Sequence, residues 1–143
     1  GSKSAPRRVC LPSASSCHYL WQADRATCLR KLIAEHFTVV FSCVKSPWFD
    51  RAWIGRTLDH SSLSEMERMA AEAPSSADGS GVATPLDLGG ERGEYHTMCL
   101  DGPLYARPVN LLQPKEVQAL ELTAQVGQKE GERWWAISMD AIV

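Results

Sequence analysis

Residues 37–44 have the sequence FTVVFSCV, an apolar and nearly uncharged run rich in β-branched and aromatic side chains. A run of this length and composition is typical of a strand that is buried on both faces. It directly follows a segment with helical periodicity, and a helix followed by a buried strand indicates a parallel α/β layer. We therefore expect an α/β fold, made of a partial parallel sheet with flanking helices and a terminal β-hairpin.

Two segments have the pattern of amphipathic helices. In residues 25–36 apolar side chains recur three and four positions apart, and Asp24 stands where an N-cap is expected. In residues 62–72, Ser62 and Glu65 have the spacing of a capping box at the start of an apolar stripe. We expect one helix in each segment.

The composition of the chain changes along its length. Residues 1–18 are rich in serine, contain prolines and have no helical or strand period, so we expect an irregular lead-in. Residues 19–106 hold the predicted helices and strands, interrupted at 73–88 by an insertion that begins rich in Pro, Ser, Gly and Ala and that we expect to be flexible. In the tail, 107–143, apolar residues alternate on both sides of a turn at 127–131, which predicts a β-hairpin.

Charge and cysteine content exclude several classes of protein. The 143 residues carry a net charge of −2, which gives no broad basic field for nucleic acid or for an anionic membrane. No apolar run is long enough to span a bilayer. The five cysteines are an odd number without a C-x-x-C pair, and the four histidines have no metal-binding spacing. We expect reduced thiols, no metal site formed by these residues, and a cytoplasmic location.

The strongest local signal is the glycine-rich segment 89–97, which leads into a candidate strand at 95–100. Its glycines allow the backbone to approach a ligand closely, and Glu91 and Glu94 bring two carboxylates nearby. Such carboxylates orient an amine or a cationic substrate, or hold Mg²⁺. The alternative is a tight turn with exposed glutamates, which is the commoner use of this composition.

A second candidate segment, residues 53–59, has the sequence WIGRTLD. Arg56 is suited to binding a phosphate or a carboxylate, and Asp59 is suited to be its counter-charge or the N-cap of the next helix. The alternative is a structural loop in which Trp53 packs on the core.

Three blocks in fixed order resemble the carboxyl-terminal part of the diphthine-ammonia ligase family, within the N-type ATP pyrophosphatases. The first is YLWQ at 19–22 with the helix after it, and the second is WIGRTLD at 53–59. The third is GERGEYHT at 90–97, followed by LDGPL at 100–104, which is similar to the family pattern GEGGEYET and LDGPL. Arg92 stands where the family has glycine, and His96 where it has glutamate.

The resemblance implies an adenine nucleotide alpha hydrolase-like fold and an ATP-dependent amidation. The expected substrates are ammonia and elongation factor 2 carrying diphthine, with ATP and Mg²⁺ as the implied cofactors. It implies catalytic roles for two residues of the glycine-rich segment, Glu91 and Glu94. The substrate-binding residues that it implies are Gly90, Gly93, Tyr95, Thr97, Arg56 and Asp59.

The chain lacks the S-G-G-K-D-S loop that holds the ATP phosphates in the family. We therefore expect a fragment that is inactive alone. The alternative is a non-catalytic module that docks on elongation factor 2 or on another translation protein.

Overall fold

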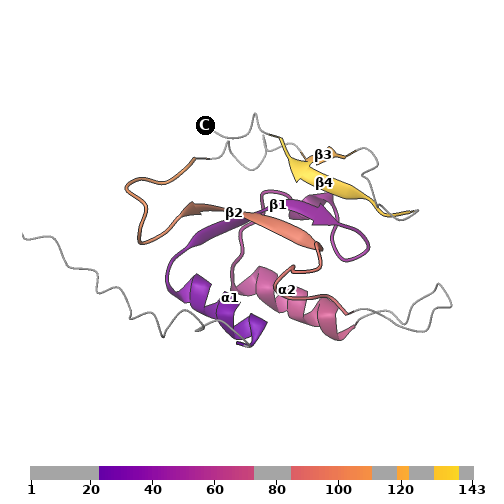
Figure 1. Cartoon of the computed structure of the whole chain (residues 1–143), viewed down its shortest axis with the longest axis horizontal. Coiled ribbons are helices and arrows are strands. Elements are labelled where there is room, and N and C mark those ends of the chain that lie inside the picture. The colour runs from indigo at the N-terminus through magenta and orange to yellow at the C-terminus, as the bar shows by residue number, and fades with distance from the viewer. Residues whose placement is uncertain (1–22, 73–84, 111–118, 123–130, 139–143) are drawn as a thin grey trace, which may run out of the picture.

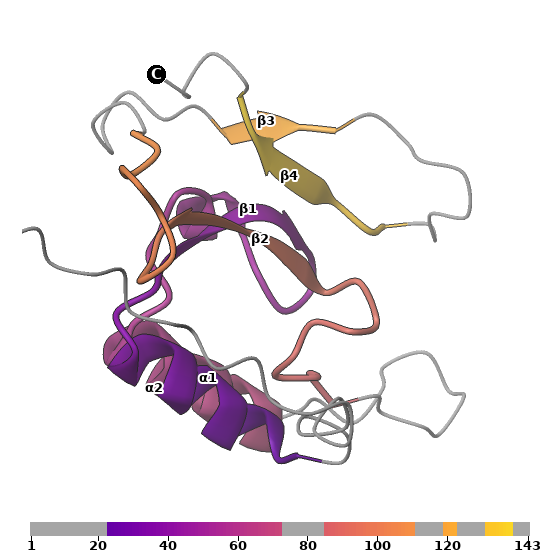
Figure 2. The ribbon, with the colours of Figure 1, turned by 60° about the vertical axis from the view of Figure 1, so that its left-hand side comes forward.

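The computed structural model describes residues 23–72, 85–110, 119–122 and 131–138, which form a mixed α/β fold. Four strands form one antiparallel sheet in the order β2-β1-β4-β3. Two helices pack together against one face of this sheet (Figures 1 and 2). In chain order the elements are α1 (Arg25–Ala34), β1 (Thr38–Lys45), the 3₁₀ turn η2 (Arg51–Trp53), α2 (His60–Ala71), β2 (Tyr95–Asp101), β3 (Ala119–Glu121) and β4 (Trp134–Ile137).

Both predicted helices are confirmed. α1 begins after Asp24, whose carboxylate accepts hydrogen bonds from the backbone N–H and the hydroxyl of Thr27. α2 begins earlier than expected, because Asp59 is its N-cap and forms the capping box with Ser62. The box predicted between Ser62 and Glu65 is therefore wrong by one turn, whereas the alternative assignment of Asp59 as an N-cap is correct.

The strand predicted at 37–44 is β1, but the prediction that its sheet is parallel is wrong. β1 pairs antiparallel with β2 on one edge and with β4 on the other. The reason lies in residues 46–58, which return along β1 before α2 begins, so that the Leu58 N–H donates to Val39 O at 2.8 Å. α2 then runs back toward the end of β1 (Figure 1). β2 starts at Tyr95, opposite Val44 near that end, so it can pair along β1 only by running in the opposite direction.

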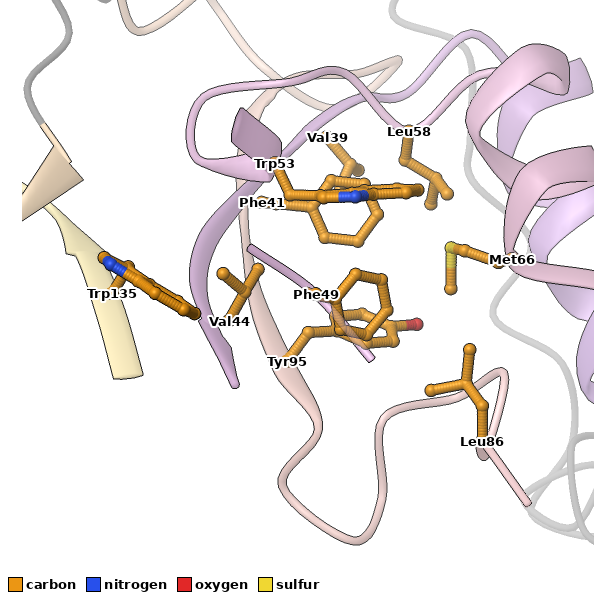
Figure 3. Close-up of a cluster of buried hydrophobic side chains, with 10 residues drawn as sticks. All are labelled: Val39, Phe41, Val44, Phe49, Trp53, Leu58, Met66, Leu86, Tyr95 and Trp135. Carbon is orange, nitrogen blue, oxygen red and sulfur yellow. The ribbon is translucent and has the colours of Figure 1, made fainter. Parts of the chain in front are cut away.

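An aromatic cluster fills the space between the sheet and the helices (Figure 3). Phe41 is fully buried, and its ring centroid lies 5.1 Å from that of Trp53 and 5.2 Å from that of Tyr95, both edge to face. Phe49 contacts the same two rings at 4.9 and 5.6 Å. Pairs of this geometry each contribute about 0.5–1.5 kcal/mol beyond the burial of their area. Around them pack Val39, Val44, Leu58, Met66, Leu86 and Trp135.

The terminal strands pair as the predicted hairpin requires. β3 and β4 are antiparallel, with Leu120 opposite Ala136, and β4 joins the main sheet through β1. Trp135 and Ile137 are buried, as their alternation indicated. The predicted turn at 127–131 lies outside the described residues except for its last position.

Other predictions fall wholly or partly outside the described residues. The lead-in at 1–18 and most of the insertion, 73–84, are among these, whereas Leu86 near the end of the insertion is buried in the core. The three cysteines that the structure describes are free thiols. Within the described part of the chain, no helix is long and apolar enough to cross a membrane.

Candidate functional site

The glycine-rich segment forms a turn that is held from inside by Glu94. This side chain is only 4% exposed, and its two carboxylate oxygens accept from the backbone N–H groups of Asp87, at 3.1 Å, and Arg92, at 3.0 Å. Hydrogen bonds from backbone N–H groups to a carboxylate are about twice as strong as neutral ones. Glu94 therefore fixes residues 87–94, which we call the glycine turn, in one shape.

Tyr95 anchors the glycine turn to the core. Its hydroxyl donates to Leu88 O at 2.6 Å, and its buried ring lies in the aromatic cluster. Burial, and then the charges of Asp87 and Glu94, raise the pKa of Tyr95 to about 12. Gly90 has φ +66° and lies against this ring, since a Cβ there would come within 3.0 Å of it. The turn thus rests on the core through a contact that only glycine permits without strain.

The outward side of the turn carries Glu91. Its carboxylate pairs with Arg25 at the start of α1, at 2.6 Å, and its side chain is 59% exposed. Unlike Glu94, it remains accessible to a substrate. The neighbouring Arg92, where the family has glycine, donates through its guanidinium to Pro85 O at 3.1 Å and so adds a second tie across the turn.

The glycine turn does not fit a nucleotide phosphate, because the N–H groups of its three glycines and of Asp87 and Arg92 are used internally. The N–H of Gly89 donates to Asp87 Oδ1, that of Gly90 to Asp87 O, and that of Gly93 to Gly90 O. The Arg92 N–H is held by Glu94. A phosphate-binding loop needs such groups to point outward. In the same described residues, no group of three His, Cys, Asp or Glu side chains is arranged to hold a metal ion.

The second predicted segment, WIGRTLD, flanks the opposite edge of β1. The Arg56 guanidinium stacks on the Trp53 ring at 4.2 Å and pairs with Glu65 of α2 at 2.7 Å. Asp59 caps α2. The structure thus brings the two segments together in the core, where Trp53 and Tyr95 both contact Phe41, while β1 separates the backbone of Arg56 from β2.

The remaining predicted residues lie just before β2 and at its start. Thr97 is exposed, as is His96. Gly93 has φ +77°, and the atom nearest to a Cβ built there is Cη2 of Trp134, at 3.9 Å. Trp134 was not predicted as a site residue, although the alternation that buries Trp135 places it on the other face of β4. The substrate roles assigned to these residues stay predictions.

Comparison with known families covers both segments of the candidate site. The family model of the diphthamide synthase C-terminal domain matches residues 25–137, which include the glycine turn, the WIGRTLD segment and all four strands. No curated protein matches the chain. The match confirms the resemblance carried by the sequence motifs. The chain therefore belongs to the diphthamide synthase C-terminal domain family and has a role in diphthamide biosynthesis.

Proposed function

We propose that this chain supplies the acceptor-substrate side of a diphthine-ammonia ligase, which amidates the carboxylate of diphthine on elongation factor 2. The observation that carries the proposal is the glycine turn. It is fixed by Glu94 and Tyr95, presents the exposed Glu91, and lies within the matched region. A turn that is ordered before binding loses less conformational entropy when a substrate binds.

The proposed reaction joins a carboxylate to ammonia. A carboxylate is a poor acceptor for an amine. One of its oxygens therefore bonds to the α-phosphorus of ATP while pyrophosphate leaves, so that AMP becomes the leaving group. Ammonia then forms the new C–N bond, the C–O bond to the leaving group breaks, and the nitrogen loses a proton.

Within this scheme the residues of the turn divide into two roles. Glu91 is exposed and orients the amine or another cationic group of the substrates. Glu94 is a positioning residue, because both its oxygens are used inside the turn. Gly93 and Thr97 border the surface on which the substrate lies, and Arg56 with Asp59 stabilises the loop beside β1.

ATP and Mg²⁺ belong to the proposal through the family and not through a site in the described residues. Since the glycine amides of the turn and the amide of Arg92 donate internally, we assign nucleotide binding to a separate half of the ligase. The reaction is assigned to the cytoplasm, where elongation factor 2 acts.

Reconstitution tests the proposal. The purified chain is combined with an ATP pyrophosphatase half, elongation factor 2 carrying diphthine, ATP and ammonium, and the mass of the modified histidine is followed. Diphthamide is expected only when both halves are present, and Glu91→Gln is expected to slow its formation. The matched control is Glu72→Gln, which removes an exposed carboxylate that pairs with Arg68 at the end of α2. ATP turnover by the isolated chain, or no effect of adding it, would contradict the proposal.

A second candidate function is a non-catalytic module that docks on elongation factor 2 or on another translation protein. It is favoured by the segment after β2, in which Leu104 is 86% exposed and Tyr105 and Val109 are also exposed. Exposed apolar residues that gather in one place are typical of protein contacts. Capture of elongation factor 2 that is lost with Leu104→Ser, in a chain that does not support amidation, would favour this function.

A further inference from the structure

Beside the glycine turn lies a cluster that neither motif contains, formed by Lys45, Glu132 and Trp134. β1 ends at the end of the sheet where β2 and β4 begin (Figure 1). Lys45 is therefore paired with Trp134 in the register of β1 and β4. The Lys45 N–H also donates to Glu94 O at 3.0 Å. The cluster is therefore tied directly to the turn that forms the proposed substrate surface.

The Trp134 ring of this cluster already accepts a cation. Lys45 Nζ lies 5.1 Å from its centroid, a distance at which an ammonium is attracted to the face of an indole. The Trp134 side chain is only partly buried, and Gly93 of the glycine turn lies beside the ring edge, with 3.9 Å from Cη2 to the position that a Cβ would occupy. The partly exposed ring thus lies next to the glycine turn.

Opposite charges accompany this ring. Lys45 Nζ and Glu132 Oε1 are 3.7 Å apart, and their side chains are 19% and 21% exposed. The indole Nε1–H of Trp134 is buried and has no acceptor among the residues that the structure describes. A buried donor without a partner is unfavourable, so an acceptor that reached it would bind favourably.

We propose that Trp134, Lys45 and Glu132 recognise a betaine group, that is, a quaternary ammonium and a carboxylate on one carbon. The inference rests on the proposed function, because diphthine carries this group. A trimethylammonium has no N–H to donate, and aromatic faces are the surfaces that recognise it. The trimethylammonium lies on the Trp134 ring near Glu132. The Lys45 ammonium moves off the ring and donates to the carboxylate of the ligand. Lys45 then orients the carboxylate that is to be amidated.

The test uses the chain by itself and glycine betaine as the probe. Binding is followed by NMR, from the indole signal of Trp134 and the amide signal of Gly93. Saturable shifts at both signals are expected with glycine betaine and not with glycine. Trp134→Ala should raise the Kd for glycine betaine, measured at the Gly93 amide, by about tenfold, since the variant lacks the cation–π contact. The matched control is Trp48→Phe, which alters another partly buried tryptophan and should bind normally.

A further variant separates the two arms of the cluster. Lys45→Met keeps the apolar stem of the side chain. It should weaken the binding of glycine betaine without weakening the binding of tetramethylammonium. An equal loss of affinity for both probes, no shift with glycine betaine, or an unchanged response in Trp134→Ala would overturn the proposal. The indole signals of the other tryptophans verify the fold of each variant. Because the titration needs neither ATP nor a second half, its result is independent of whether reconstituted amidation succeeds.

Discussion

Replacing Glu94 with glutamine tests whether this residue holds the glycine turn. Each carboxylate oxygen accepts one backbone N–H, at 3.1 Å from Asp87 and 3.0 Å from Arg92. In Glu94→Gln one oxygen becomes an NH₂ group, which cannot accept and which faces an N–H donor. The variant loses one hydrogen bond, removes the charge from the other and leaves an amide unsatisfied, so we expect the free energy of unfolding to fall by about 2 kcal/mol.

Urea unfolding followed by tryptophan fluorescence measures this loss, and amide hydrogen exchange locates it at Asp87 and Arg92. The matched control is Glu91→Gln in the same turn. The side chains of Glu91 and Arg25, which form an ion pair, are 59% and 42% exposed. Glu91→Gln should therefore lower the free energy of unfolding by less than about 1 kcal/mol. Equal effects of the two variants, or unchanged exchange at both amides, would refute the assignment of Glu94 as the residue that fixes the turn.

Three further predictions concern the fold around the site. Gly102→Ala should destabilise by about 1–3 kcal/mol in urea unfolding, because its Cβ would lie 2.5 Å from the Phe37 ring; no loss would refute that contact. Asp59→Ala removes the N-cap of α2 and should lower the melting temperature, at a cost of about 1 kcal/mol. Because the pKa of Tyr95 is raised from 10.0 to about 12, the unfolded phenol ionises first and stability should fall between those pH values. In Tyr95→Phe, which also loses the bond to Leu88, that fall should be smaller; an unchanged pH profile would contradict the raised pKa.

Local pattern predicted the elements of the fold well. The helical spacing after Asp24 and the apolar run at 37–44 correspond to α1 and β1 within one or two residues at each end. These signals are carried by near neighbours in the chain, so they do not depend on the tertiary structure. The alternation that buries Trp135 and Ile137 is of the same kind.

The direction of the sheet was not predictable from the apolar run. Three successive buried residues, Val39, Val40 and Phe41, show that β1 is covered on both faces, but they contain no information on the direction of its neighbours. That direction depends on residues 46–58, which return along β1 through a bridge between Val40 and Thr57. Such pairing is non-local and has no signal in the composition of the loop.

The sequence pattern does not distinguish the two glutamates of the turn, but the fold places them in different environments. Glu94 points inward to two amides, whereas Glu91 is exposed and pairs with Arg25 of a distant helix. Only the fold around Tyr95 decides which of them is buried. For the same reason the sequence did not indicate Trp134 or Lys45, which come together through the pairing of β1 with β4.

The central claim, that this chain provides the substrate side of the ligase, is tested most directly by binding of the substrate itself. A peptide of elongation factor 2 carrying diphthine is titrated into the isotope-labelled chain, with the peptide carrying unmodified histidine as the control. We predict shifts concentrated at 89–97 and at Trp134 for the diphthine peptide alone. Equal responses to both peptides, or shifts confined to residues far from the glycine turn, would contradict the claim.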